Sequence, residues 1–575
     1  MDSPPPRSPS PDDPFLEFSS PPASQLLPLP PGVYTLLPLV DAADNVSLPV
    51  QGVWDGVSCK KRWEEWAAKA SVASRMMPEE QVAQDSALAD DDDDDEAPVD
   101  ASATRTGAGK RKPTKQELDA EFLAPFFLAL PPAPPGTPAR RRSSSAASAT
   151  RPSFSRLTPL DSSSSRPPTP AAFAPSASRT PRSTLSSQPI GFLRPSIIRA
   201  LIEDNLSLLR MNCKPVWAFQ PPIHYPADKI EPPRTPRRRS SVRRDSTGAN
   251  GSHRPSMQEE FAGEGGVKLQ EVLDGLRRAQ LGGRGGTGPW AVAFEDWVNE
   301  EGTEVRKEHM DRIVRDWKAK GMFEECLGGW RDEHYTIYAP SPPVPSKFPS
   351  ASSDDPGDDS EPPVNPLPGS NEAFRMERCA CSLFGLPTFG VHLTAYVGGN
   401  GKPLRLWIPR RAATKSTWPS YLDNTVAGGI TAGDMPRHSI IRECWEEASL
   451  DPAWVAPRLR QAGVVTYHYR TDWGWLQPEV QYVYDLELPD PDNVADGEHK
   501  VIPTTNPADG EVESFDLLSL EEVVQRMVGG EFKPNCALVL LDFFMRHGLL
   551  SPESDTRFLE IAARLRKPLG LPGPA

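Results

Sequence analysis

The 575-residue chain has little that would place it in a membrane, outside the cell or around a metal–thiolate cluster. Its longest apolar stretch near the C-terminus, 536–544, is short and is interrupted by Asp542, so we expect no membrane span. Its first residues, MDSPPPRSPSPDD, contain neither a positively charged segment nor an apolar one, which argues against a secretory signal. The seven cysteines form no CxxC pair and have no histidine at zinc spacing. We therefore expect reduced thiols and a cytoplasmic protein, with a nuclear alternative indicated by the basic patch 110–112.

A surplus of positive charge is also missing. The formal net charge is −15, and part of it comes from the acidic run 90–96. Because nucleic-acid-binding proteins present a basic face, the charge balance does not support nucleic acid as a partner of the whole protein.

Proline, in contrast, is abundant, at 67 residues, about twice the average share. It occurs with serine and alanine in a few long stretches, a composition that predicts disorder because it cannot bury enough apolar surface. Within the N-terminal stretch, short helices over about 59–77 and 116–130 are the expected exceptions. The expected disordered segments are residues 1–187 for the most part, an insert at 231–262 and a linker at 341–371.

Two basic runs followed by serines, Arg140–Ser145 and Arg237–Ser241, are typical of sites for basophilic kinases. Phosphorylation there would change the charge of the tail. Kinases and other protein partners are therefore candidate partners of these segments.

Residues 188–340 have a different texture, with apolar residues at helical and strand spacing. Ile197, Ile198, Leu201 and Ile202 predict one face of a helix. Segments 215–219 and 328–338 are predicted strands, and segments 267–279 and 306–320 are predicted helices. These elements predict a small α+β domain.

The most informative stretch is GGITAGDMPRHSIIRECWEEASL, from Gly428 to Leu450. At about 100° per residue, segment 436–448 forms a helix with one apolar face and one face that carries Arg442, Glu443, Glu446 and Glu447. Three crowded carboxylates repel one another unless a cation lies among them, and hard divalent cations such as Mg²⁺ prefer oxygen ligands.

This stretch resembles the Nudix box, which reads Gly, five residues, Glu, seven residues, and then Arg-Glu-apolar-x-Glu-Glu-x-Gly-apolar. Two positions depart from that pattern. Asp434 replaces the first glutamate with a carboxylate shorter by one methylene, and a role as the helix N-cap ahead of Pro436 explains it equally well. Ser449 replaces the final glycine, where a left-handed conformation would cost serine about 1 kcal/mol.

The resemblance implies a Nudix α/β/α sandwich with a mixed sheet over residues 372–551, followed by a C-terminal tail at 552–575. The segments 410–430, 477–488, 509–523 and 531–543 are similar to a particular Nudix group, the one related to fungal thiamine pyrophosphokinase-associated Nudix proteins. The expected strands are 380–384, 391–397, 404–409, 463–469, 480–488 and 514–519, and the expected further helices are 521–527 and 535–547.

The resemblance also implies the site. Glu443, Glu446 and Glu447 would bind Mg²⁺ or Mn²⁺, Glu443 would also activate water, and Arg442 would hold a glutamate in place. Nudix proteins often recruit a further acid near the last strand. Glu511 is the first candidate for that catalytic role, ahead of Glu513 and Glu479.

Substrate contacts are expected from residues around the box. They are Arg410, Arg411 and Lys415 for phosphate, Trp418 for stacking on a flat ring, and Gly428 and Gly429 for close backbone approach. The resemblance implies hydrolysis of a small diphosphate, thiamine diphosphate or its oxidised analogues, to the monophosphate. A housecleaning nucleotide or nucleotide-sugar diphosphatase and a non-catalytic binding module are the alternatives.

Overall fold

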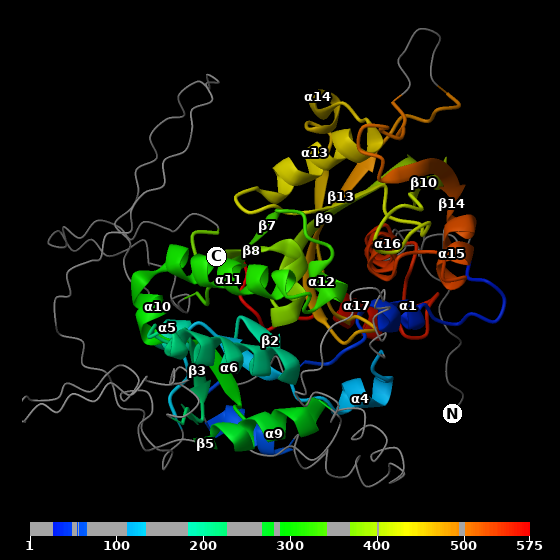
Figure 1. The fold of residues 1–575 in the computed structure, drawn as a ribbon. Helices are drawn as coiled ribbons and strands as arrows, with labels where there is room; N and C mark the ends of the chain where they lie inside the picture. Colours follow the sequence, from blue (N-terminus) through cyan, green and yellow to red (C-terminus); the bar gives the residue numbers. More distant parts are fainter. Residues whose placement is uncertain are drawn as a thin grey trace, which may run out of the picture.

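The computed structural model describes two α/β units that pack against each other (Figure 1). The described residues are 27–48, 54–55, 57–65, 112–133, 182–226, 267–280, 288–341, 369–399, 402–493 and 501–575. The predicted kinase sites, the insert at 231–262 and the basic residues 110–111 lie outside them.

The upstream unit is built on a four-stranded sheet in the order β2-β1-β6-β3. Helix α6 has Pro195 in its first turn and is amphipathic, because its apolar residues recur on one face. Strand β1 pairs antiparallel with β2 and parallel with β6. The elements of this unit are β1 (Ala124–Phe127), α5 (Arg182–Leu185), β2 (Gly191–Leu193), α6 (Pro195–Arg210), β3 (Trp217–Gln220), β4 (Ile223–His224), β5 (Val267–Lys268), α9 (Leu269–Gln280), β6 (Ala291–Phe294), α10 (Asp296–Glu301), α11 (Thr303–Ala319) and α12 (Glu324–Leu327).

Strand β1 corrects one expectation. The segment 116–130 was predicted as one helix, but the helix α4 spans only Lys115–Ala120 and the chain then enters the strand. Phe126 and Phe127 are fully buried in that strand. The four-stranded sheet of the upstream unit therefore includes a strand, β1, from the proline-rich N-terminal part. A further helix begins at residue 57, and its described residues, 57–65, overlap the predicted 59–77.

The second unit contains a six-stranded mixed sheet in the order β12-β13-β9-β10-β14, with β11 also paired to β9. Strands β13 and β9 run parallel, and the other neighbours run antiparallel. The strands are β9 (Thr388–Gly399), β10 (Lys402–Arg411), β11 (Val426–Gly429), β12 (Arg460–Arg470), β13 (Leu476–Glu487) and β14 (Val512–Ser519).

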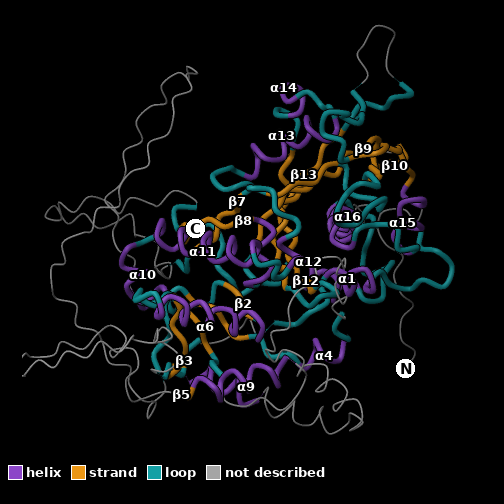
Figure 2. The backbone as a smooth tube through the Cα atoms, viewed as in Figure 1, coloured by secondary structure: helices purple, strands orange, loops and turns teal. Residues whose placement is uncertain are grey.

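Helices cover both faces of this sheet, which gives the predicted sandwich (Figures 1 and 2). Val391, Leu393 and Ala395 of β9 form a core with Ile440 and Cys444 of one helix, α13. The other face packs under a second layer. The helices are α13 (Pro436–Ala448) and α14 (Pro452–Val455) on the first side, and α15 (Leu520–Val528), α16 (Pro534–Arg546), α17 (Phe558–Leu565) and α1 (Leu37–Ala43) on the second.

Both chain-terminal segments of the described structure belong to this second layer. Asp44, which follows α1, accepts a hydrogen bond from the His468 backbone at 3.0 Å. Residues 552–575, expected as a tail, contain α17, and Thr466 of β12 bridges to Arg566. The packed unit therefore includes residues on both sides of the predicted 372–551 range.

A two-stranded sheet, β7 (His334–Tyr338) with β8 (Glu372–Glu377), packs in the core of the upstream unit, and β7 also contacts β9 of the second unit. The next segment was predicted as a strand over 380–384, but it forms a 3-10 helix, Arg378–Phe384. Gly385, at φ +55°, ends that helix and starts the turn into β9. Cys379 and Cys381 lie in this 3-10 helix, and all seven cysteines are free.

No helix in the described part of the chain is long and apolar enough to cross a membrane.

Candidate active site

Helix α13 follows β11 through a short loop, and both of its ends differ from a typical box helix. Asp434 is not the N-cap: Met435 occupies that position without a side-chain cap, and the Asp434 carboxylate pairs with Arg442 instead. Ser449 does take the left-handed conformation, at φ +52°, and the Leu450 N–H donates to the Cys444 carbonyl at 3.0 Å. The serine thus performs the turn that glycine usually makes.

The three box glutamates lie in different environments along the same helix. Glu446 is the most exposed, at 46% of its side chain, and Glu447 is buried at 8%. One Glu447 oxygen accepts a hydrogen bond from the Ala427 N–H at 2.9 Å. The Glu443 carboxyl packs over Gly428, where any Cβ would overlap it. Gly428 is therefore needed to leave room for Glu443.

Burial makes these carboxyls hard to ionise in the absence of a cation. Burial raises the pKa of Glu443 to about 7, although Arg442 acts in the opposite direction. Burial and the nearby Glu443 charge raise the pKa of Glu447 well above its ordinary value. Among the residues that the structure describes, Arg442 is the cation that pairs with this group, at 3.5 Å from Glu443 and 3.6 Å from Glu446.

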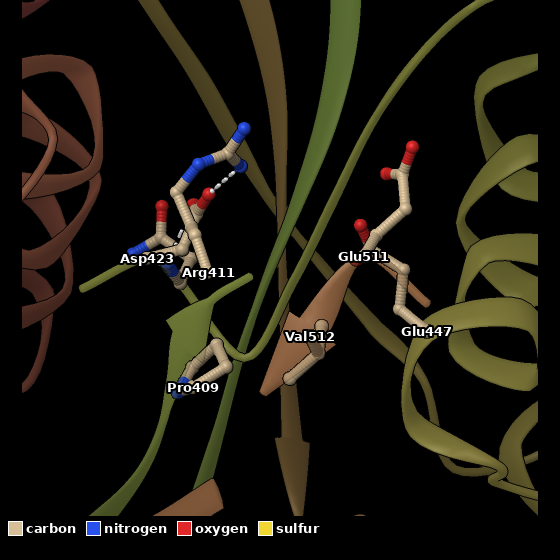
Figure 3. A pocket seen from close by; sticks show the side chains of 7 residues that line it. Pro409, Arg411, Asp423, Glu447, Glu511 and Val512 are labelled. Carbon is tan, nitrogen blue, oxygen red and sulfur yellow. Dashed lines mark hydrogen bonds and ion pairs between the residues drawn. The ribbon is translucent and has the colours of Figure 1, made fainter. Parts of the chain in front are cut away.

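Glu511, just before β14, lies near the box carboxylates. Glu511 ion-pairs with Lys415 and lies 3.7 Å from Arg331 of the upstream unit. Although burial opposes ionisation, these cations hold the pKa of Glu511 below its ordinary value. With Glu447, Glu511 lines one side of a small pocket, and Arg411 and Asp423 line the other (Figure 3).

Arg411 is held firmly in that pocket. Its guanidinium donates to the Asp423 carboxylate at 2.6 Å and to the Trp418 carbonyl at 3.1 Å. Burial would raise the pKa of Asp423, but Lys533 and Arg411 hold it well below its ordinary value. Asp423 was not expected at the site, because nothing in its local sequence separates it from an ordinary loop acid.

Four other predicted residues lie elsewhere. Arg410 donates to the Ser420 carbonyl at 2.8 Å and does not line this pocket. Trp418 packs edge-on against Tyr421, with ring centroids 5.1 Å apart, at a separate, mostly apolar pocket of about 490 Å³. Glu513 is exposed on β14, and Glu479 is bonded to Tyr467 and Gln481 within the sheet.

Gly429 has a neighbour from the upstream unit. A Cβ at this position would overlap the Tyr335 hydroxyl, so the missing side chain admits an aromatic ring of β7 against the box loop. Close backbone approach at Gly429 therefore serves a contact between the two units.

A second group with metal-ligand chemistry was not expected from the sequence. Ligand atoms of His392, Asp423 and Cys536 all lie within 4.8 Å of one another, closer than the box carboxylates converge. The Cys536 thiol is 2.6 Å from Asp423, and His392 is hydrogen-bonded to Asn424 at 2.7 Å. Because Arg411 and Lys533 already neutralise Asp423, a metal ion there would meet two cations. We interpret this group as a hydrogen-bonded structural network.

Comparison with known proteins agrees with this geometry. The NUDIX domain model matches residues 391–536, which include the sheet, the box helix and Glu511. The chain belongs to the Nudix superfamily. The predicted enzyme class, a hydrolase that acts on pyrophosphate bonds, is confirmed at the level of the family.

Two curated relatives show how far the similarity extends. An uncharacterized protein of Saccharomyces cerevisiae is 32% identical over 279 residues, which cover 46% of this chain and 70% of the yeast protein. Nudix hydrolase 20 of Arabidopsis thaliana, named as chloroplastic, is 38% identical over 205 residues, which cover 36% of this chain and 51% of the plant protein. Cytoplasmic localisation of this chain stays a prediction.

Among solved structures, a C. elegans Ap4A hydrolase complex aligns over 28% of this chain and 99% of its own, with 15% identity and a TM-score of 0.21.

The donor set of the box helix fits a hard divalent cation. Glu443, Glu446 and Glu447 offer only carboxylate oxygens, which Mg²⁺ and Mn²⁺ favour. Burial, with a smaller contribution from neighbouring carboxylates, raises the pKa of Glu443 and Glu447, so a bound cation would favour their ionised forms. The surroundings would therefore favour the binding of a cation by these residues.

Proposed function

We propose that the protein is a Mg²⁺- or Mn²⁺-dependent diphosphohydrolase that cleaves thiamine diphosphate or an oxidised analogue to the monophosphate. The observation that carries the catalytic part is the cluster of Glu443, Glu446 and Glu447 on one helix, with Glu511 beside it. The thiamine assignment is supported by the resemblance of the segments 410–430 and 477–488 to the thiamine-related Nudix group.

In the proposed reaction, water attacks one phosphorus of the diphosphate, the bridging P–O bond breaks, and phosphate and the monophosphate leave. A bound divalent cation neutralises the phosphate oxygens and lowers the pKa of water. Glu443, Glu446 and Glu447 would hold that cation. Glu443 would also accept the proton of the attacking water.

The neighbouring residues would orient the reacting groups. Arg442 bridges Asp434, Glu443 and Glu446 and thereby fixes the carboxylates. Arg411 and Lys415, held by Asp423 and Glu511, would supply positive charge for the phosphates. Arg411 is the better placed of the two, because it lines the same pocket as Glu447.

The test is a substrate panel on the full-length protein, since β1 at 124–127 is part of the upstream sheet. The panel contains thiamine diphosphate, its oxo and oxy analogues, oxidised and ordinary nucleoside triphosphates, and nucleotide sugars, each with Mg²⁺, with Mn²⁺ and with a chelator. We expect metal-dependent release of a monophosphate, fastest for a thiamine analogue. Faster turnover of a nucleotide would reject the thiamine assignment, and no turnover of any diphosphate would favour the binding-module alternative.

A further inference from the structure

The upstream unit contacts the box loop directly, through the first residues of β7. Glu333 accepts a hydrogen bond from the Thr431 hydroxyl at 3.0 Å, and the His334 carbonyl accepts one from the Ala432 N–H at 2.8 Å. The Tyr335 hydroxyl lies over Gly429. These contacts fix the loop that precedes the box helix.

Arg331 lies two positions before Glu333, and its side chain extends toward Glu511 of the candidate active site. Its guanidinium lies 3.7 Å from Glu511, and 46% of its side chain is exposed. The Arg331 N–H donates to the buried Glu377 carboxylate at 3.2 Å, which fixes the backbone from which the side chain extends. The guanidinium is therefore anchored at its base and open to solvent at its tip.

Glu511 does not need Arg331 to be neutralised. Lys415 pairs more closely with the same carboxylate and is only 13% exposed, so the Lys415–Glu511 pair is the inner one. Two cations thus face one carboxylate, and the positive charge of Arg331 is in excess. A loose, half-exposed ion pair is worth little to stability, so the guanidinium can exchange this partner for another anion at low cost.

An additional cation beside the acidic site would help it to accept an anion. Within the described part of the chain, Asp434, Glu443 and Glu446 share one guanidinium, that of Arg442. A diphosphate that approaches this group is repelled unless positive charge meets it from another direction. Arginine also suits phosphate better than lysine, because its planar fork can bind two oxygens at once.

We propose that Arg331, a residue of the upstream unit, binds a phosphate of the diphosphate substrate, so that the site is completed by both units. This inference rests on the proposed diphosphohydrolase function. Arg378 is assigned a different role, because it is occupied by Glu333 at 2.5 Å and lies over the Tyr335 ring at 5.3 Å. It positions β7 against the box loop.

The test compares Arg331→Gln, Arg331→Lys and Arg315→Gln in the full-length protein. Arg315 is a charge-matched control on α11: it is 56% exposed and lies near Asp332 and Trp330. We expect Arg331→Gln to raise KM about tenfold to hundredfold, the range for losing a hydrogen bond to a charged group, with kcat changed less than about threefold. Arg331→Lys should recover part of this loss, and Arg315→Gln should resemble the unmutated protein.

A second readout does not depend on turnover. Calorimetric titration with methylenediphosphonate, a diphosphate that cannot be hydrolysed at the bridge, should show the same order of affinities with and without Mg²⁺. Equal effects of Arg331→Gln and Arg315→Gln would mean that Arg331 acts only through its long-range charge, which would overturn the proposal. A loss confined to kcat would overturn it as well. If the unmutated protein hydrolyses no diphosphate, the proposed function fails as well, whereas normal hydrolysis by Arg331→Gln rejects only the role of Arg331.

Discussion

The two charged groups around Glu511 are built in opposite ways. The acidic group comes from one helix, α13, whose geometry alone places Glu443, Glu446 and Glu447 together. The cationic group comes from separate parts of the chain: Arg331 and Arg378 belong to the upstream unit, and Arg411 and Lys415 belong to the end of β10 and its following loop. A local pattern specifies the first group, and tertiary packing assembles the second.

This difference predicts different tolerance to change. Each carboxylate of the helix has a distinct position and burial, so the others cannot replace it. The cations share carboxylate partners, since Glu511 is served by Lys415 and Arg331, and Asp423 by Arg411 and Lys533. Loss of one cation should therefore weaken binding, whereas loss of one carboxylate should remove catalysis.

The largest effect is expected at Glu446, the most exposed of the box carboxylates. Glu446→Gln keeps the size of the side chain and removes its charge, so the fold should be unchanged. We expect kcat to fall at least about 100-fold on whichever diphosphate the panel identifies, the low end for removing one electrostatic contributor. Glu521→Gln, an exposed change on α15, serves as the control. A loss below tenfold at Glu446 would show that the acidic group is as redundant as the cationic one.

The second effect concerns the pH dependence of stability in the chelated, metal-free protein. The pKa of Glu443 rises from 4.5 to about 7 on folding, so between these values the folded state keeps a proton that the unfolded state has lost. The free energy of unfolding should therefore decrease as pH rises from about 4.5 to about 7, by about 3 kcal/mol for this group.

Glu443→Gln removes this contribution, and denaturant unfolding at pH 5 and pH 8 measures it. The variant should be more stable than the unmutated protein at pH 8 and similar to it at pH 5. The remaining pH dependence would come from groups such as Glu447, whose pKa is also raised. Mg²⁺ at pH 8 should stabilise the unmutated protein more than the variant. Parallel curves for the two proteins would mean that the Glu443 carboxyl ionises freely.

The third effect concerns two neighbouring glycines, Gly428 beside the Glu443 carboxyl and Gly429 beside Tyr335 of the upstream unit. A Cβ in Gly428→Ala would overlap the Glu443 carboxyl, which can swing away because it ends a flexible side chain. We expect a tenfold to hundredfold loss of activity, roughly the cost of a 1 Å displacement, with little change in melting temperature. In Gly429→Ala the Cβ would overlap the hydroxyl of Tyr335, a rigid ring, so stability should fall as well. The reverse order of stabilities would break the assignment of Gly429 to the interface.

The same distinction explains what could be predicted from the sequence. The box helix was recognised because its apolar face repeats every few residues within one short segment, and its structure confirms the helix from Pro436 to Ala448. Arg331, Asp423 and the docking of Tyr335 on Gly429 were not foreseen, since each depends on contacts between residues distant in sequence. The strand at 124–127 was missed for a similar reason: four apolar residues after a helix carry no period, and their partner strands lie at 191–193 and 291–294.

The predicted strand at 380–384 was wrong for another reason. Alternating small and apolar residues fit a strand as well as the 3-10 helix that the chain forms at 378–384. The N-cap role of Asp434 is not found in the structure, because its side chain had two suitable partners. A free helix end and the guanidinium of Arg442 both attract a carboxylate, and the charged partner wins in the structure.

The smallest effect concerns the end of the acidic helix. Ser449 is held at φ +52°, a conformation that costs a residue with a Cβ about 1 kcal/mol, so Ser449→Gly should raise the free energy of unfolding by up to about that amount. Ala448→Gly, one residue earlier and within the helix, should lower it by a similar amount. Because the carboxylates precede this turn, kcat should stay unchanged in Ser449→Gly, as measured with the same substrate. A gain in activity together with stability would instead mean that the serine had kept the helix, and with it the acidic group, slightly out of position.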